Sequence, residues 1–306
     1  MNIECLLISL LRYLTISLFK HMKLIADSGS TKSSWCLLEG KELKTTVKTA
    51  GLNPYFHTSE SIDAILKAEL LPFIVTDHVK EIHFYGAGCS TEKNDELISG
   101  TLQTFFHQAR IFVYHDILGA ARALFGKNRG ISCILGTGCN CCYYDGENIF
   151  SKVDSLGYLF GDEGAGSYLG KNLISDYLRK KLPADLRVEF DSNYRLSLED
   201  ILNSLYNLPY PNRFLASFSE FLARYQEHPY VYKLVHDAFH AFLDAQVKHY
   251  EGYREMPVSF VGSIAHHYNK ILLEAAAEEG IHIGTVIKAP MEGLLKFHNL
   301  SSEIAR

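Results

Sequence analysis

One plan of strand, small-residue turn and strand occurs twice in this chain, and this repetition constrains the fold more than any other feature. The first copy is KLIADSGSTKSSWCLL (23–38) and the second is ISCILGTGCNCCYYDGENIF (131–150). An acidic residue and a glycine then reverse the chain in both copies, as two-residue hairpin turns do: Glu39-Gly40 and Asp145-Gly146. The repetition predicts two related domains, each beginning with a hairpin whose first turn faces the other domain.

The segments around the two copies predict an α/β fold. A helical pattern at 62–70 is followed by the strands EIHFYGAG (81–88) and ARIFVYHD (109–116), and then by the helix ILGAARALFG. Strand, helix and strand in succession imply a partly parallel sheet. After the second copy the pattern is mostly helical, with one apolar stripe along VYKLVHDAFHAFLDAQVKHY (231–250).

Length and composition agree with two domains. The chain has 306 residues, of which 47% are hydrophobic, and this is enough for two cores. Because no low-complexity linker interrupts the sequence, we expect a tight boundary near residue 125. The first domain is expected at 22–125 and the second, with helical insertions, at 126–306.

The first 21 residues, MNIECLLISLLRYLTISLFKH, need a separate interpretation. They are apolar, but Glu4 stands where a signal peptide carries positive charge, and Arg12 interrupts the apolar run. Met22 directly precedes the first predicted strand. We therefore interpret residues 1–21 as an extension from a misplaced start codon. A membrane or export segment and a structural helix are the alternatives.

Charge and cysteine content limit the class of protein. The net charge of −5 gives no basic footprint for nucleic acid, and no membrane partner is expected. Seven cysteines are too few for the framework of a small secreted module, so reduced thiols and a cytoplasmic location are expected. Cys139, Cys141 and Cys142 are expected to be free thiols, because adjacent residues of a strand point to opposite faces.

The first turn places a carboxylate and small polar residues directly after a buried strand. Asp27 is either an Asx-type turn former or a carboxylate that holds the water shell of a magnesium ion beside phosphates. Gly29, Ser30 and Thr31 would then supply backbone and hydroxyl donors to the phosphates, with Lys32 as an electrostatic helper. The turn lacks the Walker pattern GxxxxGK[ST] and is not a P-loop.

The second turn contains Gly136, Thr137 and Gly138. The triplet GTG occurs in many loops, and its weight comes from standing at the same structural point as the first turn. Two facing glycine-rich hairpins can hold a polyphosphate from both sides. Cys139 follows this turn directly, and nearby backbone donors are expected to favour its thiolate.

Two further segments carry acids at the start of helices. Asp116 follows the strand IFVYH and is either a helix cap or a base that accepts a proton from an attacking hydroxyl. The segment SLGYLFGDEGAGSYLG (155–170) has five glycines and the pair Asp162-Glu163. These acids could be simple partners of a helix dipole. Five glycines in sixteen residues favour backbone that approaches a ligand closely.

These motifs, in this order, resemble the BadF/BadG/BcrA/BcrD ATPase family, and within it the N-acetylglucosamine kinases. That family belongs to the actin, sugar kinase and Hsp70 superfamily. DSGSTKS is similar to the first phosphate motif and GTGCNC to the second. HDILGA is similar to the segment with the catalytic aspartate, LGYLFGDEGAG to the sugar loop and FVGSIA to the adenosine motif. The resemblance covers residues 22 to 300.

The resemblance implies two ribonuclease H-like (actin-like ATPase) domains with ATP, Mg²⁺ and a sugar in an interdomain cleft. It implies that Asp116 is the general base for the sugar hydroxyl and that Asp27 anchors the magnesium ion. The implied sugar contacts are Asn53, Gly157 and Asp162, and the implied nucleoside contacts are Gly262 and Ser263.

The resemblance implies an ATP-dependent kinase that phosphorylates an amino sugar, N-acetylglucosamine, at the 6-hydroxyl. Two positions depart from the family pattern: Cys139 replaces a serine, and Leu156 replaces the tryptophan of the mammalian-type enzymes. Glucosamine remains open as a substrate, as does a homodimer as the assembly. The alternatives are an iron–sulfur ATPase activator of a radical dehydratase and a non-catalytic sugar or nucleotide sensor.

Overall fold

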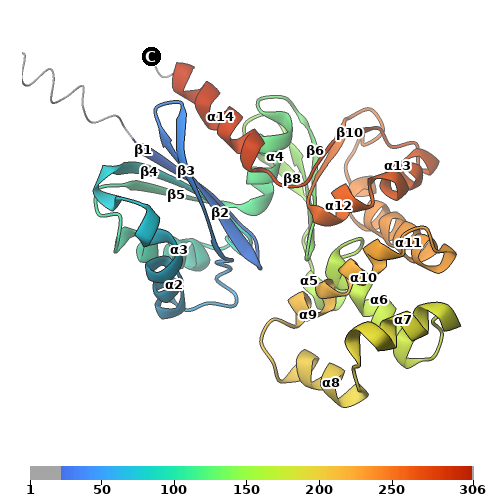
Figure 1. Ribbon diagram of the computed structural model, residues 1–306. Helices are drawn as coiled ribbons and strands as arrows, with labels where there is room; N and C mark the ends of the chain where they lie inside the picture. Colours follow the sequence, from blue (N-terminus) through green and yellow to red (C-terminus); the bar gives the residue numbers. More distant parts are fainter. Residues whose placement is uncertain (1–21, 305–306) are drawn as a thin grey trace, which may run out of the picture. The chain divides into compact units, whose positions relative to one another are not determined.

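The computed structural model describes residues 22–304, and the expectations for residues 1–21 lie outside this range. The chain folds into two compact units. Among the described residues, the first contains 22–116 together with 298–304, and the second contains Ile117–Phe297. Figure 1 shows the helices and strands of both units.

A five-stranded sheet forms the centre of the first unit. Its order is β3-β2-β1-β4-β5; β1, β2 and β3 are antiparallel neighbours, and β4 and β5 continue the sheet parallel to β1. The strands are β1 (Met22–Ser28), β2 (Lys32–Glu39), β3 (Glu42–Ala50), β4 (Val79–Gly86) and β5 (Arg110–His115).

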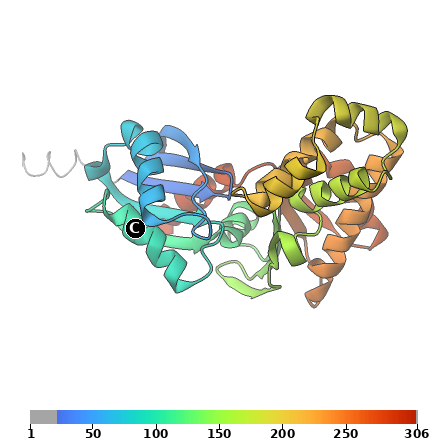
Figure 2. The same ribbon diagram turned by 90° about the horizontal axis from the view of Figure 1, so that it is seen from below.

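Different elements cover the two faces of this sheet. Helices α2 (Ser59–Ile65) and α3 (Glu92–Gln103) lie on the same side in Figures 1 and 2, over a core that includes Trp35 and Phe84. Next to Phe84 on the same strand, Tyr85 points to the other face. Its hydroxyl hydrogen-bonds His298 Nε2 at 3.0 Å. The C-terminal part of α14 (Met291–Ile304) therefore belongs to the first unit.

The sheet of the second unit repeats the topology of the first. Its order is β10-β9-β6-β7-β8; β6, β7 and β8 are antiparallel, and β9 and β10 extend the sheet parallel to β6. The strands are β6 (Gly130–Leu135), β7 (Cys139–Tyr144), β8 (Ile149–Lys152), β9 (Val258–Val261) and β10 (Ile283–Ile287). Strand order and directions match one for one, which confirms the two related ribonuclease H-like domains.

The helices of the second unit pack on both faces of its sheet. They are α4 (Asp116–Phe125), α5 (Gly157–Phe160), α6 (Gly166–Leu178), α7 (Ala184–Tyr194), α8 (Leu198–Tyr206), α9 (Pro211–Ser217), α10 (Ser219–Arg224), α11 (Pro229–Ala245), α12 (Ser263–His267), α13 (Asn269–Glu278) and the first part of α14. The core under α6, α11 and α13 contains Cys133 and Cys141, whereas Cys142 packs on the other face against α4. The prediction that Cys141 and Cys142 point to opposite faces is confirmed.

The boundary between the two units differs from the sequence-based boundary near residue 125. Ile117, Ala120 and Ala121 of α4 share a buried cluster with Tyr144 and Val261, so this helix belongs to the second unit almost from its first residue. The amphipathic pattern of α4 identified a helix, but it did not say which sheet the apolar face would cover.

One of the two predicted hairpin turns needs correction. Glu39-Gly40 does begin a tight turn, but Asp145-Gly146 belongs to a four-residue turn between β7 and β8. The carboxylate of Asp145 accepts hydrogen bonds from the backbone N–H groups of Glu147 and Asn148, each at 2.8 Å, and so stabilises the longer turn.

No helix within residues 22–304 is long and apolar enough to span a membrane.

Candidate active site

The predicted site residues divide between the two units, and each set is described within its own unit. The first unit carries Asp27, Gly29, Ser30, Thr31, Lys32, Asn53 and Asp116; the second carries Gly136, Thr137, Gly138, Gly157, Asp162, Gly262 and Ser263.

The first turn joins β1 to β2 and is closed by its own backbone. Gly29 N–H donates to the Lys32 carbonyl at 3.0 Å, and Gly51 N–H donates to the Thr31 carbonyl at 3.1 Å. Thr31 and Lys32 are exposed at the tip of the turn. Backbone and side-chain donors of this turn are therefore accessible to a ligand.

Gly51 supports the turn from below, and its role was not anticipated from the sequence. A Cβ at this position would lie 2.3 Å from the Gly29 carbonyl oxygen and 2.8 Å from Lys32 N. Real Cβ atoms do not approach backbone this closely, so only glycine allows the turn to pack here. The signal that could have found it is the glycine at the end of β3, in AGLNPYF.

A pair of buried serines ties the same loop to the base of the turn. The hydroxyl oxygens of Ser28 and Ser33 are 2.7 Å apart, and Ser28 Oγ accepts the N–H of Leu52 at 3.0 Å. Both serines have no exposed surface. The segment that carries Gly51 and Asn53 is therefore fixed relative to the turn.

Asn53 contacts the first turn directly. Its Nδ2 donates to Ser30 Oγ at 2.9 Å, and its Oδ1 accepts the N–H of Tyr55 at 3.0 Å. The side chain is almost fully buried, with 6% of the residue exposed. Gly88, at φ +83°, packs against Oδ1 where a side chain would collide. Asn53 therefore positions the turn, a role that the sequence analysis did not assign to it.

Asp27 and Asp116 form the carboxyl pair of the first unit. Asp27 is near the end of β1, and Asp116 is the first residue of α4, directly after β5. Burial, and next the negative charge of Asp116, raise the pKa of Asp27 to about 7, although Lys32 opposes the shift. His115 Nδ1 lies 2.6 Å from Asp116 Oδ1. Two carboxylates that repel each other beside a turn of N–H donors suit a bound magnesium ion.

The second turn joins β6 to β7 and is held by the start of α6. Gly136 N–H donates to the Gly138 carbonyl at 3.0 Å, which closes the turn. Gly166 N–H donates to the Gly136 carbonyl at 2.9 Å, and Ser167 N–H to the Thr137 carbonyl at 3.0 Å. Two of the N–H groups that a helix leaves unused at its N-terminus are therefore used here.

Asp162 lies directly beneath the second turn. Its Oδ1 accepts the N–H of Cys139 at 3.0 Å, and its Oδ2 accepts the Ser167 hydroxyl at 3.1 Å. A Cβ on Gly138 would lie 2.8 Å from Oδ1. Asp162 has a left-handed φ of 60°, and burial raises its pKa. The acid therefore holds the turn to α6 and does not merely face a helix dipole.

Gly262 packs against the same turn from β9. It has φ +135°, and a Cβ would lie 2.1 Å from the Leu135 carbonyl oxygen and 3.2 Å from Gly136 N. Only glycine combines this φ with this contact. Ser263 is exposed at the first position of α12. The structure thus brings the adenosine motif of the sequence to the phosphate turn of the same unit.

Gly157 begins α5, away from the turn contacts just described. It has φ +67°, and its carbonyl accepts the N–H of Gly161 at 2.8 Å. The side chains around it are unusually exposed for apolar residues: Leu156 at 61%, Leu159 at 65% and Phe160 at 81%. This loop presents an apolar surface. Leu156, which is smaller than the tryptophan of the family pattern, forms part of it.

The expectation of a reactive Cys139 thiolate is wrong for this environment. Cys139 is 6% exposed. Burial, and then the negative charges of Asp162 and Glu163, raise the pKa of its thiol. Its backbone N–H is already bound to Asp162 and cannot stabilise a thiolate. Within residues 22–304 the six cysteines are buried free thiols, as predicted for Cys139, Cys141 and Cys142.

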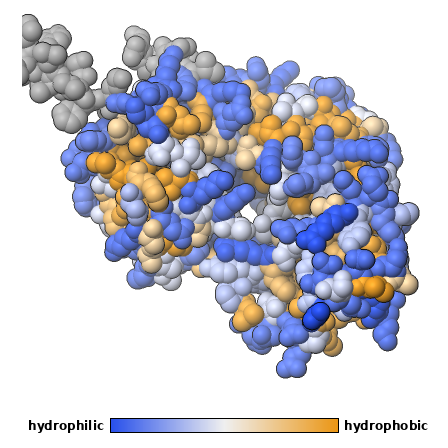
Figure 3. All heavy atoms as spheres, viewed as in Figure 1, coloured by the Kyte–Doolittle hydropathy of each residue, from blue (hydrophilic) through white to orange (hydrophobic). Residues whose placement is uncertain are grey.

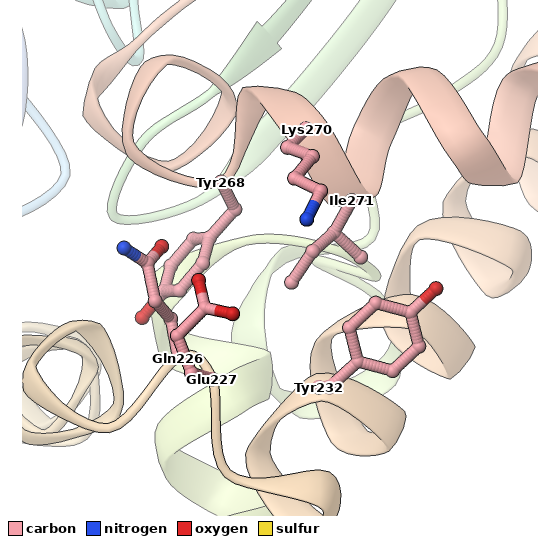
Figure 4. A pocket seen from close by; sticks show the side chains of 6 residues that line it. All are labelled: Gln226, Glu227, Tyr232, Tyr268, Lys270 and Ile271. Atoms are coloured by element: carbon pink, nitrogen blue, oxygen red, sulfur yellow. The ribbon is translucent and has the colours of Figure 1, made fainter.

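Two hollows in the second unit contain none of the predicted site residues. One has a volume of about 30 Å³ and is shown in Figure 4, lined by Gln226, Glu227, Tyr232, Tyr268, Lys270 and Ile271. It has room for about one water molecule, not for a sugar or nucleotide. The other is an open groove along α8 alone. Figure 3 shows apolar residues scattered among the hydrophilic residues on the face that it presents.

Two sheets of one topology, each opening with a glycine-rich turn, define the class of protein: the actin-like ATPase and sugar kinase fold. Its solved members include a protein from Porphyromonas gingivalis described as a "Putative N-acetylglucosamine Kinase". It has 40% sequence identity and a TM-score of 0.87, covering 91% of this chain and 99% of that one. The chain therefore belongs to the N-acetylglucosamine kinase-like group of the BadF/BadG/BcrA/BcrD ATPase family, as its motifs predicted.

More distant solved structures share the fold alone. A protein of the same description from Chromobacterium violaceum has 14% identity and a TM-score of 0.70, with 91% of this chain and 99% of that chain covered. The ethanolamine utilization protein EutJ from Carboxydothermus hydrogenoformans has 14% identity and a TM-score of 0.53, with 91% and 89% covered. No protein-family model matches the sequence. No curated protein matches it either.

Proposed function

We propose that the protein is an ATP-dependent amino-sugar kinase that phosphorylates N-acetylglucosamine at the 6-hydroxyl. The observation that carries the proposal is the pair Asp27 and Asp116, which interact strongly enough to contribute to the raised pKa of Asp27. A carboxyl pair beside a phosphate-type turn suits transfer to a hydroxyl, whereas a binding protein needs no base. The 40% identity to the Porphyromonas gingivalis protein supports the sugar class.

Asp116 acts as the general base. It accepts the proton of the sugar hydroxyl as that oxygen attacks the terminal phosphorus of ATP. The contact between His115 Nδ1 and Asp116 Oδ1, at 2.6 Å, fixes the orientation of the carboxylate. Phosphoryl transfer needs a base only modestly, so most of the rate comes from positioning and charge neutralisation.

Asp27 is the residue that would hold Mg²⁺, through the water shell of the ion. When bound, this ion neutralises phosphate charge. The raised pKa of Asp27 fits such a role, since a cation offsets both the burial and the repulsion by Asp116 that disfavour the ionised carboxylate. Lys32 and the hydroxyl groups of Ser30 and Thr31 are assigned to phosphate oxygens in the first unit, and Thr137 and Gly138 in the second. The N–H groups of Gly29 and Gly136 close their own turns, so these two glycines are assigned close backbone approach to the phosphates.

Room at the tips of the turns supports phosphate binding. A Cβ on Gly136 would meet no described atom within 4 Å, and one on Gly29 would meet only the Lys32 carbonyl, at 3.7 Å. The fold itself therefore has space for a side chain at both positions. Glycine there leaves the backbone open to close approach by a ligand.

Sugar and nucleoside contacts complete the proposal. Asn53, Gly157 and Asp162 are assigned to the sugar, and Gly262 and Ser263 to the nucleoside. Because the oxygens of Asp162 already accept two hydrogen bonds, we assign it a shared role in holding the turn and contacting the sugar. Leu156 gives a smaller apolar wall than tryptophan. We therefore expect glucosamine to be a detectable second substrate.

The test compares N-acetylglucosamine, glucosamine and glucose in one coupled ADP-release assay, with the position of the phosphate assigned by NMR. We expect the highest kcat/KM for N-acetylglucosamine, a lower value for glucosamine and a poor one for glucose. A site that binds sugar substituents through buried polar groups rejects analogues that leave those groups unpaired. A clear preference for glucose, or no sugar-dependent ADP release, overturns the proposal.

A further inference from the structure

Two histidines and a glutamate meet on the outer helices of the second unit. His236 and His240 are one turn apart on α11, and Glu278 ends the neighbouring helix α13. His236 Nε2 lies 3.3 Å from Glu278 Oε1, and His240 Nε2 lies 2.9 Å from Glu278 Oε2. One ligand atom from each of the three residues lies within 4.8 Å of the others. None of the three belongs to the predicted active site.

We propose that His236, His240 and Glu278 form a binding site for a divalent transition-metal ion, with Zn²⁺ as the expected occupant. Histidines at positions i and i+4 present both rings on one face of a helix, as zinc sites require. Bonds of about 2.0–2.2 Å in a tetrahedral arrangement separate neighbouring ligand atoms by roughly 3.3 Å. The 3.3 Å between His236 Nε2 and Glu278 Oε1 has that value, and His240 Nε2 lies 2.9 Å from the other oxygen, Oε2, so both carboxylate oxygens face the histidine pair.

The environment of His240 provides a second, independent argument. Its Nδ1 lies 3.0 Å from Glu279 Oε1, while its Nε2 faces Glu278. A neutral imidazole has one N–H and can donate to only one of these carboxylates. The other nitrogen then presents a lone pair to a carboxylate oxygen. Zn²⁺ at Nε2, with the Nδ1–H donated to Glu279, satisfies both partners.

Glu279 has the position of a residue that orients a metal-binding histidine. Such histidines usually donate their second N–H to a carboxylate, which fixes the tautomer and the ring orientation. Glu279 is itself held by Lys248, at 2.6 Å from its Oε2, and Lys248 also contacts Asp244. His240 Nδ1–H would donate to Glu279 and leave Nε2 as the ligand atom.

The site is open enough for an ion to enter from solvent. The side chains of His236 and His240 are 17% and 25% exposed, and that of Glu278 is 57% exposed. Three protein ligands would leave one position for water. Because the ligands come from α11 and α13, bound Zn²⁺ would join the two helices and stabilise the folded second unit by mass action.

The experiment titrates ZnCl₂ into EDTA-treated protein by calorimetry, without nucleotide or sugar, and measures the melting temperature in parallel. We expect one zinc ion per chain and a rise in Tm that EDTA reverses. His236→Gln, His240→Gln and Glu278→Gln should each weaken binding at least tenfold. Glu279→Gln should weaken it by about tenfold through orientation of His240. These positions are at least partly exposed, so the variants should fold, and circular dichroism checks this.

His266→Gln with His267→Gln is the matched control, since these exposed histidines of α12 lie outside the site. This double variant should bind zinc like the wild type. Replacing Zn²⁺ by Co²⁺ identifies the ligands, because a sulfur-to-metal charge-transfer band would reveal cysteine. Absence of stoichiometric zinc binding would overturn the proposal. Equal binding by His240→Gln or a cysteine band would also overturn it. Kinase activity enters none of these measurements, so the two proposals fail separately.

Discussion

The two glycine-rich turns stand at the same point of two sheets of one topology, yet they are held in different ways. The first is held by neutral groups: the close approach of Gly51 and the amide of Asn53 bound to Ser30. The second is held by a buried carboxylate, Asp162, and by N–H groups at the start of α6. The topology therefore determines where a turn lies, and local contacts determine how firmly it is held.

The turns also differ in what surrounds them chemically. The first unit has Asp27 and Asp116, whose charges interact, next to its turn. The carboxylate beside the second turn, Asp162, is already engaged by Cys139 N–H and the Ser167 hydroxyl. We infer that the carboxyl groups of the first unit are available for chemistry, whereas Asp162 of the second unit mainly holds its own turn.

Asp116→Asn should have the largest effect and tests this division directly. Loss of the base should lower kcat by about 10²–10⁴-fold. KM for ATP should change little, because Asp116 is assigned to the sugar hydroxyl and not to the nucleotide. Asp162→Asn is the matched variant, and it should keep most of kcat since an amide can still bond Cys139 N–H. Steady-state kinetics with N-acetylglucosamine provide the measurement. Similar losses of kcat in both variants would contradict the division.

Gly51 and Gly262 pack against the backbone of the turns and should matter more for folding than Gly29 and Gly136 at the tips. Gly51→Ala and Gly262→Ala would place a Cβ 2.3 Å and 2.1 Å from backbone oxygen. Each should lower the free energy of unfolding by about 3 kcal/mol.

Gly29→Ala and Gly136→Ala are the controls for this pair, because the fold has room at both positions. They should change the free energy of unfolding by less than about 1 kcal/mol and should weaken ATP binding instead. Urea denaturation and ATP titration measure the two quantities. Tip variants as unstable as the lower pair would show that the fold, rather than a ligand, requires glycine at the tips.

Asp27→Asn should raise stability while it removes activity. The folded protein keeps a proton on Asp27 up to about pH 7, whereas the unfolded chain releases it near 3.8. The free energy of unfolding therefore falls as pH rises from about 4 to 7. Asparagine cannot ionise, so the variant does not lose this stability. At pH 8, above both pKa values, the variant should be more stable by about 4 kcal/mol, since a shift of about three pKa units is lost there. Urea denaturation of both proteins at pH 4 and pH 8 tests this, and equal differences at the two pH values would contradict it.

Asn53→Ala should have a smaller effect, on both substrates. Without the structure we would expect only the sugar KM to rise. Because Asn53 Nδ2 donates to Ser30 Oγ, its loss should also loosen the first turn and raise KM for ATP severalfold. Ser30→Ala keeps the amide that is assigned to the sugar, and it removes both the hydrogen bond and a proposed phosphate donor. It should raise KM for ATP alone. An unchanged KM for ATP in both variants would show that the bond does not position the turn.

Much of this molecule could be predicted from its sequence, and the limits have physical causes. The apolar strands on either side of DSGST and GTG identified two hairpins, and the repetition correctly implied matching sheets. Gly51 could not be found in this way, because its requirement comes from a contact with a turn twenty residues away. The histidine pair on α11 was also overlooked. Its spacing of four was present in VHDAFH, but the third ligand lies on another helix.

Alkylation at Cys139 should have the smallest effect on activity. It also allows a last comparison of the two units. Its position after the second turn suggested a reactive thiolate, but burial and two acidic neighbours raise its pKa. Iodoacetamide should therefore leave Cys139 unmodified in the native enzyme. The activity that remains after this treatment should be the same whether or not ATP and magnesium were present during it. Cys36 of the first unit, 2% exposed, is the internal control. Mass spectrometry along a urea series should show each cysteine labelled as its own unit opens. Rapid native labelling of Cys139 that ATP prevents would restore the reactive thiol and show that the second turn is less firmly held than its contacts indicate.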